Sequence, residues 1–174
     1  MSRLKGRAAV VTGAGRGIGR GIAHRLAAEG ASVAVNDIDA PSAESVATEL
    51  RALGGQAFAH PCDAGDEAQV FDLVYAAERE FGRVDIAVAN ALYSRHSPFL
   101  DAKFADVRRT TEVLLFGAFH LAQAAARRMV ARGEGGREPS RAKHSKRSGP
   151  VPDQRQRRRA GLDRHAGRAS DVRR

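Results

Sequence analysis

The chain has 174 residues, a single cysteine and a formal net charge of +9, a size that suits one folded domain and a cysteine count that excludes an internal disulfide. No apolar run approaches the roughly 18 residues of a membrane span or follows the order of a secretion signal, so we expect no membrane association and a cytoplasmic location. The charge is unevenly spread: residues 1–136 hold 16 basic and 16 acidic side chains, whereas residues 137–174 hold 13 basic and 4 acidic ones.

The first predicted elements are a strand and a helix separated by a glycine-rich loop. Residues 8–12 are apolar and rich in β-branched side chains, which is typical of a buried strand. Residues 17–30 place Ile18, Ile22 and Leu26 at four-residue spacing, as on one face of a helix. A strand followed by a helix is the first half of a βαβ unit.

The same alternation continues along the chain. The pattern predicts a strand over 32–36, a helix over 40–55, a strand over 56–60, a helix over 67–81, a strand over 84–90 and helical segments from about 101 to 132. The last of these strands is almost continuously apolar, as expected when both of its faces are covered. We therefore predict an α/β fold for residues 1–136, a truncated doubly wound parallel sheet of about four strands with flanking helices.

Gly13, Gly17 and Gly19 lie between the first strand and the first helix. Glycines here let the backbone turn tightly and approach a pyrophosphate, while the helix N-terminus offers unpaired N–H groups and a positive dipole end. Glycines needed only for a tight turn are the alternative explanation. The position between a strand and a helix favours a Rossmann-like dinucleotide site.

Asp37 follows the second strand, 18 residues after Gly19. An acid about 20 residues beyond the glycines binds the ribose hydroxyls of NAD. A carboxylate there also repels the 2′-phosphate of NADP, although Arg16 in the glycine loop offsets part of that repulsion. We therefore predict NAD as the cofactor, with NADP as the less favoured alternative; a turn or helix-start role is the other explanation of Asp37.

Four motifs in chain order resemble the short-chain dehydrogenase/reductase family. They are the glycine loop Thr12-Gly13-x-x-x-Gly17-Ile18-Gly19, Asp37, CDA at residues 62–64 and VANA at residues 88–91. The resemblance implies that the Ile18 N–H binds the pyrophosphate and that Asp63, beside Ala64, meets the adenine amino group. It also implies that Asn90 and Ala91 lie along the cofactor ribose. By the same resemblance, the intact protein transfers hydride between a nicotinamide and a secondary alcohol or carbonyl.

The chain departs from the family pattern at two positions before residue 136. Leu92 stands where the motif after the fourth strand usually ends in glycine. Leu114 stands where an asparagine of the family's catalytic site is common. A leucine cannot hold the proton-relay water that such an asparagine positions, so one functional group is replaced.

After Gly136 the resemblance stops. The family next supplies a serine and then Tyr-x-x-x-Lys, in which the lysine lowers the tyrosine pKa so that the hydroxyl exchanges a proton with the substrate. Tyrosine occurs only at Tyr75 and Tyr93, with Arg79 and Ser97 four residues later, so no such motif exists here. We assign no catalytic residue and predict that these 174 residues are inactive; a non-catalytic dinucleotide-binding fragment is the alternative function.

Residues 137–174 form a basic tail for which we predict disorder, because its large aliphatic residues are only Val151, Leu162 and Val172. It holds 11 arginines and 2 lysines, and with proline, alanine and glycine this matches GC-rich codons. One hypothesis is a frameshift or a mistaken gene model near codon 136, which translation of the other two reading frames tests. The alternative is a nucleic-acid or import patch at RQRRR, residues 155–159.

The resemblance also predicts how the chain behaves in solution. In the family, further strands cover the fourth strand, and the helices of residues 101–132 form the face of a homo-oligomer. Without those strands the fourth strand keeps an unpaired edge, so we expect poor solubility or a molten state rather than a stable oligomer. The six histidines show no metal-ligand spacing, and no metal site is predicted.

Overall fold

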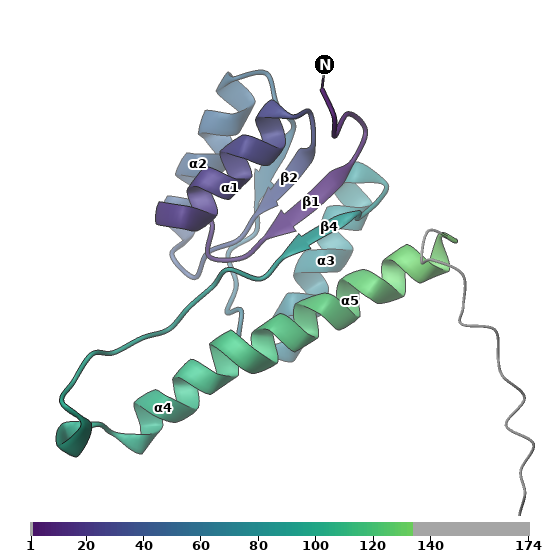
Figure 1. The fold of residues 1–174 in the computed structure, drawn as a ribbon. Helices are drawn as coiled ribbons and strands as arrows, with labels where there is room; N and C mark the ends of the chain where they lie inside the picture. Colours follow the sequence, from purple (N-terminus) through teal and green to yellow (C-terminus); the bar gives the residue numbers. More distant parts are fainter. Residues whose placement is uncertain (1, 134–174) are drawn as a thin grey trace, which may run out of the picture. The chain divides into compact units, whose positions relative to one another are not determined.

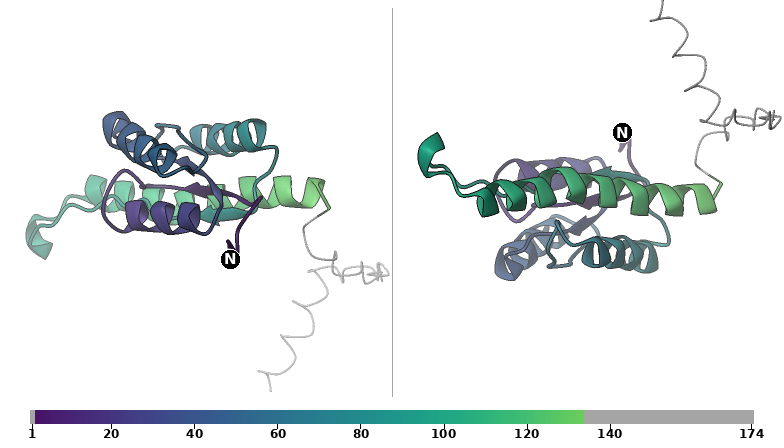
Figure 2. Two further views of the ribbon diagram at one scale, coloured as in Figure 1. Left: turned by 90° about the horizontal axis from the view of Figure 1, so that it is seen from above. Right: turned by 90° about the horizontal axis from the view of Figure 1, so that it is seen from below.

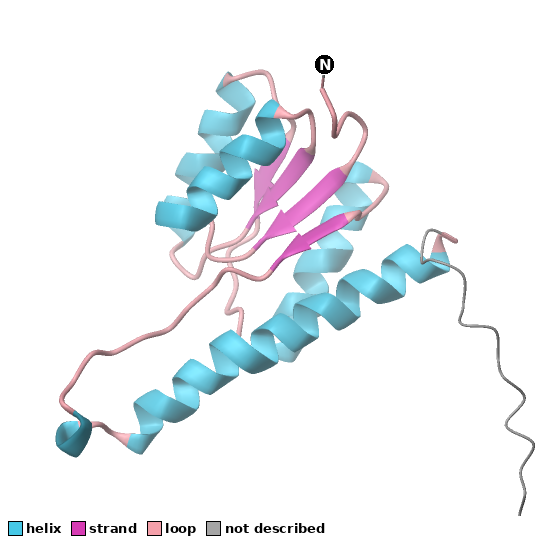
Figure 3. Ribbon diagram, in the orientation of Figure 1, coloured by secondary structure: helices cyan, strands magenta, loops and turns pink. Residues whose placement is uncertain are grey.

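The computed structural model describes residues 2–133; the predicted basic tail and its RQRRR segment lie outside these residues. The elements in chain order are β1 (Ala8–Val11), α1 (Gly17–Ala28), β2 (Ser32–Val35), α2 (Ala40–Ala52), β3 (Ala57–Ala59), α3 (Glu67–Phe81), β4 (Ile86–Val88), a 3₁₀ turn (Phe99–Asp101), α4 (Phe104–Thr111), a π-helical segment (Glu112–Phe116) and α5 (Gly117–Ala131). Figures 1 and 3 show these elements along the chain.

The four strands form one parallel sheet in the order β3-β2-β1-β4. In its centre, Val10 of β1 pairs with Ala34 of β2 on one side and with Ala87 of β4 on the other. Each connection between neighbouring parallel strands passes through a helix, as parallel pairing requires. The predicted doubly wound α/β sheet is confirmed.

The core lies on both faces of the sheet. On one face, Val11, Val33 and Val35 pack with buried residues of α1 and α2. On the opposite face, Val10 and Ala34 pack with buried residues of α3 and α5. Because successive strand residues point to opposite faces, apolar side chains are required at every position, which explains the continuous apolar runs in the sequence.

All four predicted strands are shorter in the structure than in the sequence pattern, and β1 and β2 each end one residue early, at Val11 and Val35. The fourth strand spans Ile86–Val88 rather than 84–90, and the third spans Ala57–Ala59 rather than 56–60. Beyond the end of β4, Asn90 donates hydrogen bonds to Thr12 and Gly13, which follow the neighbouring strand β1. The helical region begins at Phe104 rather than near residue 101.

The helical region after the 3₁₀ turn is one long run with an irregular centre. Figure 2 shows α4 and α5 following one line past the sheet. The π-helical segment between them contains Leu114, the position at which the sequence lacks the family asparagine. Over residues 2–133, no helix is both long and apolar enough to cross a membrane.

Candidate functional site

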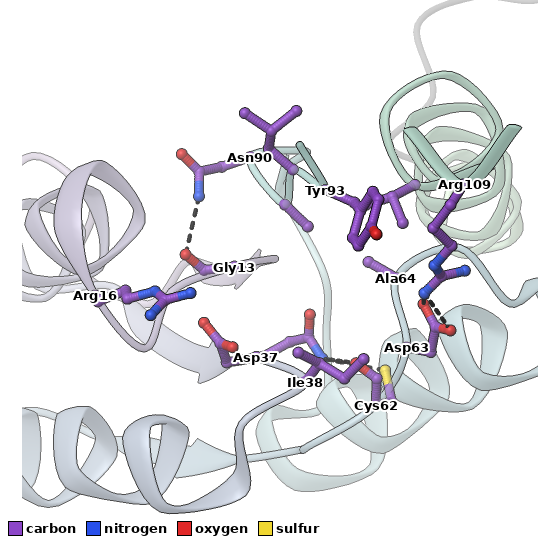
Figure 4. Close-up of a pocket in the computed structure, with 14 residues that line it drawn as sticks. Gly13, Arg16, Asp37, Ile38, Cys62, Asp63, Ala64, Asn90, Tyr93 and Arg109 are labelled. Atoms are coloured by element: carbon purple, nitrogen blue, oxygen red, sulfur yellow. Dashed lines mark hydrogen bonds and ion pairs between the residues drawn. The ribbon is translucent and has the colours of Figure 1, made fainter. Parts of the chain in front are cut away.

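A cavity of about 240 Å³ lies at the carboxyl ends of the strands, beside the point where the chain order reverses between β1 and β4. In open α/β sheets this is where ligands bind. The cavity is lined by Gly13, Arg16, Asn36, Asp37, Ile38, Cys62, Asp63, Ala64, Asn90, Ala91, Leu92, Tyr93, Arg109 and Val113. Figure 4 shows these side chains coming from loops and, for Arg109, from a helix, segments that lie far apart in the sequence.

The loop after β1 is held against the loop after β4. The side-chain amide of Asn90 donates to the carbonyls of Thr12 and Gly13, both at 3.0 Å. The backbone N–H groups of Asn90 and Ala91 donate to Thr12 Oγ1 at 3.1 and 3.2 Å. The Asn90 amide N–H groups are thus used to hold the glycine loop, a role that the sequence pattern did not indicate.

Two glycines allow these loops to approach closely. A Cβ on Gly19 would overlap the carbonyl oxygen of Gly13 and lie 2.5 Å from Asn90 Nδ2. Gly13 has a φ of +62°, and a Cβ there would lie 2.8 Å from the Cα of Ala91. Any side chain at these positions therefore forces the loop apart.

The first turn of α1 follows directly. Gly17 starts the helix with a φ of +55°, a left-handed conformation that favours glycine. Ile18 is largely exposed, and neither Gly17, Ile18 nor Gly19 lines the cavity itself. The N-cap residue Arg16 makes no side-chain cap hydrogen bond, and the first turn of α1 holds no acidic residue. The N-terminal end of α1 thus presents its free N–H groups and the positive end of the helix dipole, and no acidic side chain of its first turn competes for them.

Asp37 lies at the cavity and also organises the turn around it. Its Oδ2 accepts a hydrogen bond from the Gly15 N–H at 3.0 Å, and its Oδ1 accepts one from the Asp39 N–H at 3.1 Å. A Cβ on Gly15 would come 2.8 Å from Asp37 Oδ2, so Gly15 is a site residue that the sequence pattern did not single out. Figure 4 shows the Arg16 guanidinium extending toward Asp37 from the glycine loop.

Asp63 lies on the opposite side of the cavity and is paired with an arginine from α4. Arg109 Nη2 lies 2.6 Å from both carboxylate oxygens of Asp63, and the Gly65 N–H donates to Oδ1 at 2.8 Å. Although partial burial acts to raise the pKa of Asp63, the hydrogen bonds from Arg109 and Gly65 lower it below its usual value. Asp63 therefore presents an ionised carboxylate.

Some residues that line the cavity lie outside the four motifs that carried the family resemblance. Asn36 donates to the carbonyls of His60 and Cys62, tying the end of β2 to the loop after β3. Tyr93 donates to Asp106 of α4 at 2.9 Å. These contacts join residues far apart in the chain, so they left no local pattern in the sequence.

Two side chains bear on chemistry, Cys62 in the cavity and Leu114, which lies outside its lining. Burial, together with nearby carboxylates, raises the pKa of Cys62 to about 12, so the thiol stays protonated and is a poor nucleophile. Leu114 is 54% exposed and offers no polar group. Among residues 2–133, no three histidine, cysteine or acidic side chains gather as a metal site would require.

Comparisons with known proteins agree over most of the described region. A sequence model with the description short chain dehydrogenase matches residues 7–137. The 7alpha-hydroxysteroid dehydrogenase of Escherichia coli strain K12 is 46% identical over 133 residues, which are 76% of this chain and 52% of that protein. The L-rhamnose 1-dehydrogenase (NAD(P)(+)) of Sphingomonas sp. strain SKA58 is 43% identical over 138 residues, 78% of this chain and 54% of that one.

A solved structure of a hydroxysteroid dehydrogenase also matches this chain. The structure of 7 alpha-hydroxysteroid dehydrogenase complexed with NADH and 7-oxo glycochenodeoxycholic acid superposes with a TM-score of 0.71 at 46% identity. The match covers 75% of this chain and 51% of that chain. This chain thus spans about half the length of the relatives that it matches.

Proposed function

The chain belongs to the short-chain dehydrogenase family, and we propose that it binds a nicotinamide dinucleotide in the cavity at the carboxyl ends of its strands. The observation that carries the proposal is the close packing at Gly13 and Gly19. A Cβ on Gly19 would overlap the carbonyl oxygen of Gly13, and a Cβ on Gly13 would overlap the backbone of Ala91. Such an approach exposes backbone N–H groups to a pyrophosphate, as in other dinucleotide sites. The solved relative that contains NADH supports the same ligand class.

Each part of the dinucleotide has residues of suitable chemistry. We assign the pyrophosphate to Gly13, Gly17 and the N–H groups of Ile18 and Gly19, because the start of α1 carries no acidic side chain. The loop after β4, with Asn90 and Ala91, is assigned to the ribose on the nicotinamide side. The adenosine end is assigned to Asp37, Asp63 and Ala64, which line the cavity together.

Asp37 makes NAD the favoured cofactor in this proposal. The N–H groups of Gly15 and Asp39 each donate to one of its oxygens and so hold the carboxylate, which supports its assignment as the acceptor for ribose hydroxyls. A 2′-phosphate at the same position would meet a negative charge. Arg16, which also lines the cavity, offsets part of that repulsion. We therefore expect NADP to bind as well, but more weakly than NAD.

The intact members of the family carry out hydride transfer, and the nicotinamide supplies or accepts the hydride when bound. The residues of this chain bind and orient the dinucleotide, but they provide no Tyr-x-x-x-Lys for the proton that accompanies the hydride. We therefore propose that the 174 residues bind cofactor without turning over a secondary alcohol or carbonyl. A cytoplasmic location is part of the same proposal.

The cofactor assignment is tested by equilibrium titration with NADH and NADPH, following nucleotide fluorescence. We expect NADH to bind more tightly than NADPH, and Asp37→Asn to reduce this preference by about tenfold, since a charge repulsion of roughly 1.4 kcal/mol is removed. Asp39→Asn is the matched control, because its side chain contacts Ser42 and does not line the cavity. Equal or tighter binding of NADPH by the unaltered chain would refute the NAD assignment.

A turnover assay tests the second part of the proposal. The chain is incubated with NAD and a panel of secondary alcohols, and NADH formation is followed by absorbance. We expect no turnover above a sample without protein. If the unaltered chain turns over and a folded Gly19→Ala variant does not, the activity belongs to the dinucleotide site. Other residues would then supply the proton, and the proposal of an inactive chain would be wrong.

A further inference from the structure

The loop after β3 meets the α4–α5 helical run without an intervening side chain. A Cβ on Gly65 would lie 2.8 Å from Arg109 Nη1 and 3.3 Å from Val113 Cγ2. A Cβ on Gly117, the first residue of α5, would overlap the carbonyl oxygen of Ala64. The helical run is therefore packed directly on the loop that carries Asp63.

Arg109 occupies the space that this packing leaves. Its Nη2 contacts both oxygens of Asp63 at 2.6 Å, and its Nη1 lies 3.5 Å from Glu112 Oε2. The side chains of Asp63 and Arg109 are 28% and 29% exposed, so the pair is shielded from most of the solvent. Both residues line the cavity, which distinguishes this ion pair from pairs on the outer surface such as Arg51 with Glu44.

The two carboxylate oxygens of Asp63 accept different numbers of hydrogen bonds. A carboxylate oxygen accepts about two hydrogen bonds. Oδ1 accepts from Arg109 and from the Gly65 N–H, so both of its positions are used. Oδ2 accepts from Arg109 among the described residues, which leaves one acceptor position for a donor from outside the chain.

We infer that Arg109 is a positioning residue: it holds Asp63 so that Oδ2 accepts a hydrogen bond from the exocyclic amino group of a purine. The inference rests on the proposed dinucleotide site, in which Asp63 faces the adenine amino group, and adds to it the residue of α4 that holds the Asp63 carboxylate. Adenine carries an amino group at the base edge where hypoxanthine carries an oxygen, and an oxygen facing a carboxylate has no hydrogen to donate. The arrangement therefore selects adenine over hypoxanthine, and Arg109 maintains that selection.

The experiment compares the dissociation constants of NADH and of its deamino analogue, reduced nicotinamide hypoxanthine dinucleotide, by nucleotide fluorescence. We expect the unaltered chain to bind NADH about tenfold more tightly than the analogue, the value of one hydrogen bond to a charged group. In Arg109→Met, which keeps the apolar stem, the preference falls to within about twofold, because Asp63 loses the group that orients it. In Arg109→Lys, part of the preference returns.

Arg108→Met is the matched control. Arg108 neighbours Arg109 on α4, is 74% exposed in its side chain and pairs only with Glu112 among the contacts of the described residues. It does not line the cavity, so its replacement leaves the preference unchanged. Thermal unfolding of every variant is recorded so that a loss of preference is separated from a loss of fold.

The outcomes distinguish this inference from the function on which it rests. If the unaltered chain binds neither dinucleotide, the proposed function fails. If it binds both equally, or if folded Arg109→Met keeps the full preference, the function stands and the role of Arg109 is refuted. Should Arg109→Met not fold, Arg109→Gln decides: it keeps a polar side chain, shorter and without the charge, and an unchanged preference in that variant refutes the role.

Discussion

Gly19 illustrates how one atom decides the shape of the cofactor loop. The position has no room for a Cβ, because the carbonyl of Gly13 and the amide of Asn90 already occupy it. We predict that Gly19→Ala weakens NADH binding at least about tenfold and lowers the free energy of unfolding by about 1–3 kcal/mol, as over-packing of a tight contact does. Fluorescence titration and denaturant unfolding measure the two effects.

Gly21→Ala is the control for that substitution. Gly21 lies in the same helix, and a Cβ there meets no atom within 4 Å. Because alanine is the better helix former by about 1 kcal/mol, we expect unchanged NADH binding and equal or higher stability. If Gly19→Ala behaved like Gly21→Ala, the close approach would have no part in binding.

At the same scale, the sequence predicted some site residues and not others. Gly13, Asp37 and Asp63 follow strand ends at recognisable spacing, and the structure places all three at one cavity. Arg109 was missed because its contact with Asp63 joins residues 46 positions apart and depends on how α4 packs on the loop after β3. No local pattern carries that information.

Asp85 joins three elements at the amino-terminal end of the sheet. Its carboxylate accepts from the Ala8 N–H at 2.9 Å and pairs with Arg7, Arg83 and Arg132, which precede β1, precede β4 and follow α5. The Asp85 side chain is only 6% exposed. We predict that Asp85→Asn lowers the free energy of unfolding by about 2–3 kcal/mol, because hydrogen bonds to a shielded charge are lost.

The contribution of Asp85 is expected to depend on pH. Although burial acts to raise the pKa of Asp85, the hydrogen bonds from Arg83, Ala8 and Arg7 lower it well below the usual 3.8. The folded state therefore takes up the proton less readily than the unfolded state, and the stabilisation is present above pH 3.8 and lost as the pH falls toward the lowered value.

Denaturant unfolding across this acidic range measures the effect. The stability difference between the unaltered chain and Asp85→Asn narrows as the pH falls. Asp72→Asn serves as the control, since that side chain is 61% exposed and its ion-pair contacts are 3.4 and 4.0 Å long. An equal pH dependence for the two variants would contradict the role of Asp85.

The elements also show where periodicity stops being informative. The order of strands and helices followed from short continuous apolar runs and from helical spacing of about 3.6 residues, and the structure has that order. The end of β4 did not follow, and beyond it Asn90 donates hydrogen bonds to the loop after β1. The π-helical segment was also not predicted, since its apolar spacing fits an α-helix equally well.

For the molecule as a whole, the α4–α5 run carries an apolar face that is not buried. Its exposed large apolar side chains, each 49% to 79% exposed, are Phe104, Val107, Leu114, Leu115, Phe116, Phe119 and Val130. In sheet order, β4 is the last strand. Exposed apolar side chains in such number on one helical run favour association or loose packing.

We predict that the purified chain binds an apolar fluorescent dye and unfolds over a broad temperature range. The double variant Leu115→Glu with Phe119→Glu is expected to raise solubility and reduce dye binding. It leaves NADH binding unchanged, since neither residue lines the cavity. A sharp cooperative transition of a monomer that binds no dye would contradict the prediction.

The location of the dinucleotide is tested most directly by nuclear magnetic resonance of the isotope-labelled chain, whose 18.6 kDa mass suits the method. Amide signals are recorded as NADH is added. We expect saturable shifts concentrated at Gly13 to Gly19, Asp37 and Ile38, Asp63 and Ala64, and Asn90 and Ala91. Absence of shifts in a folded chain, or shifts centred on other residues, would contradict it.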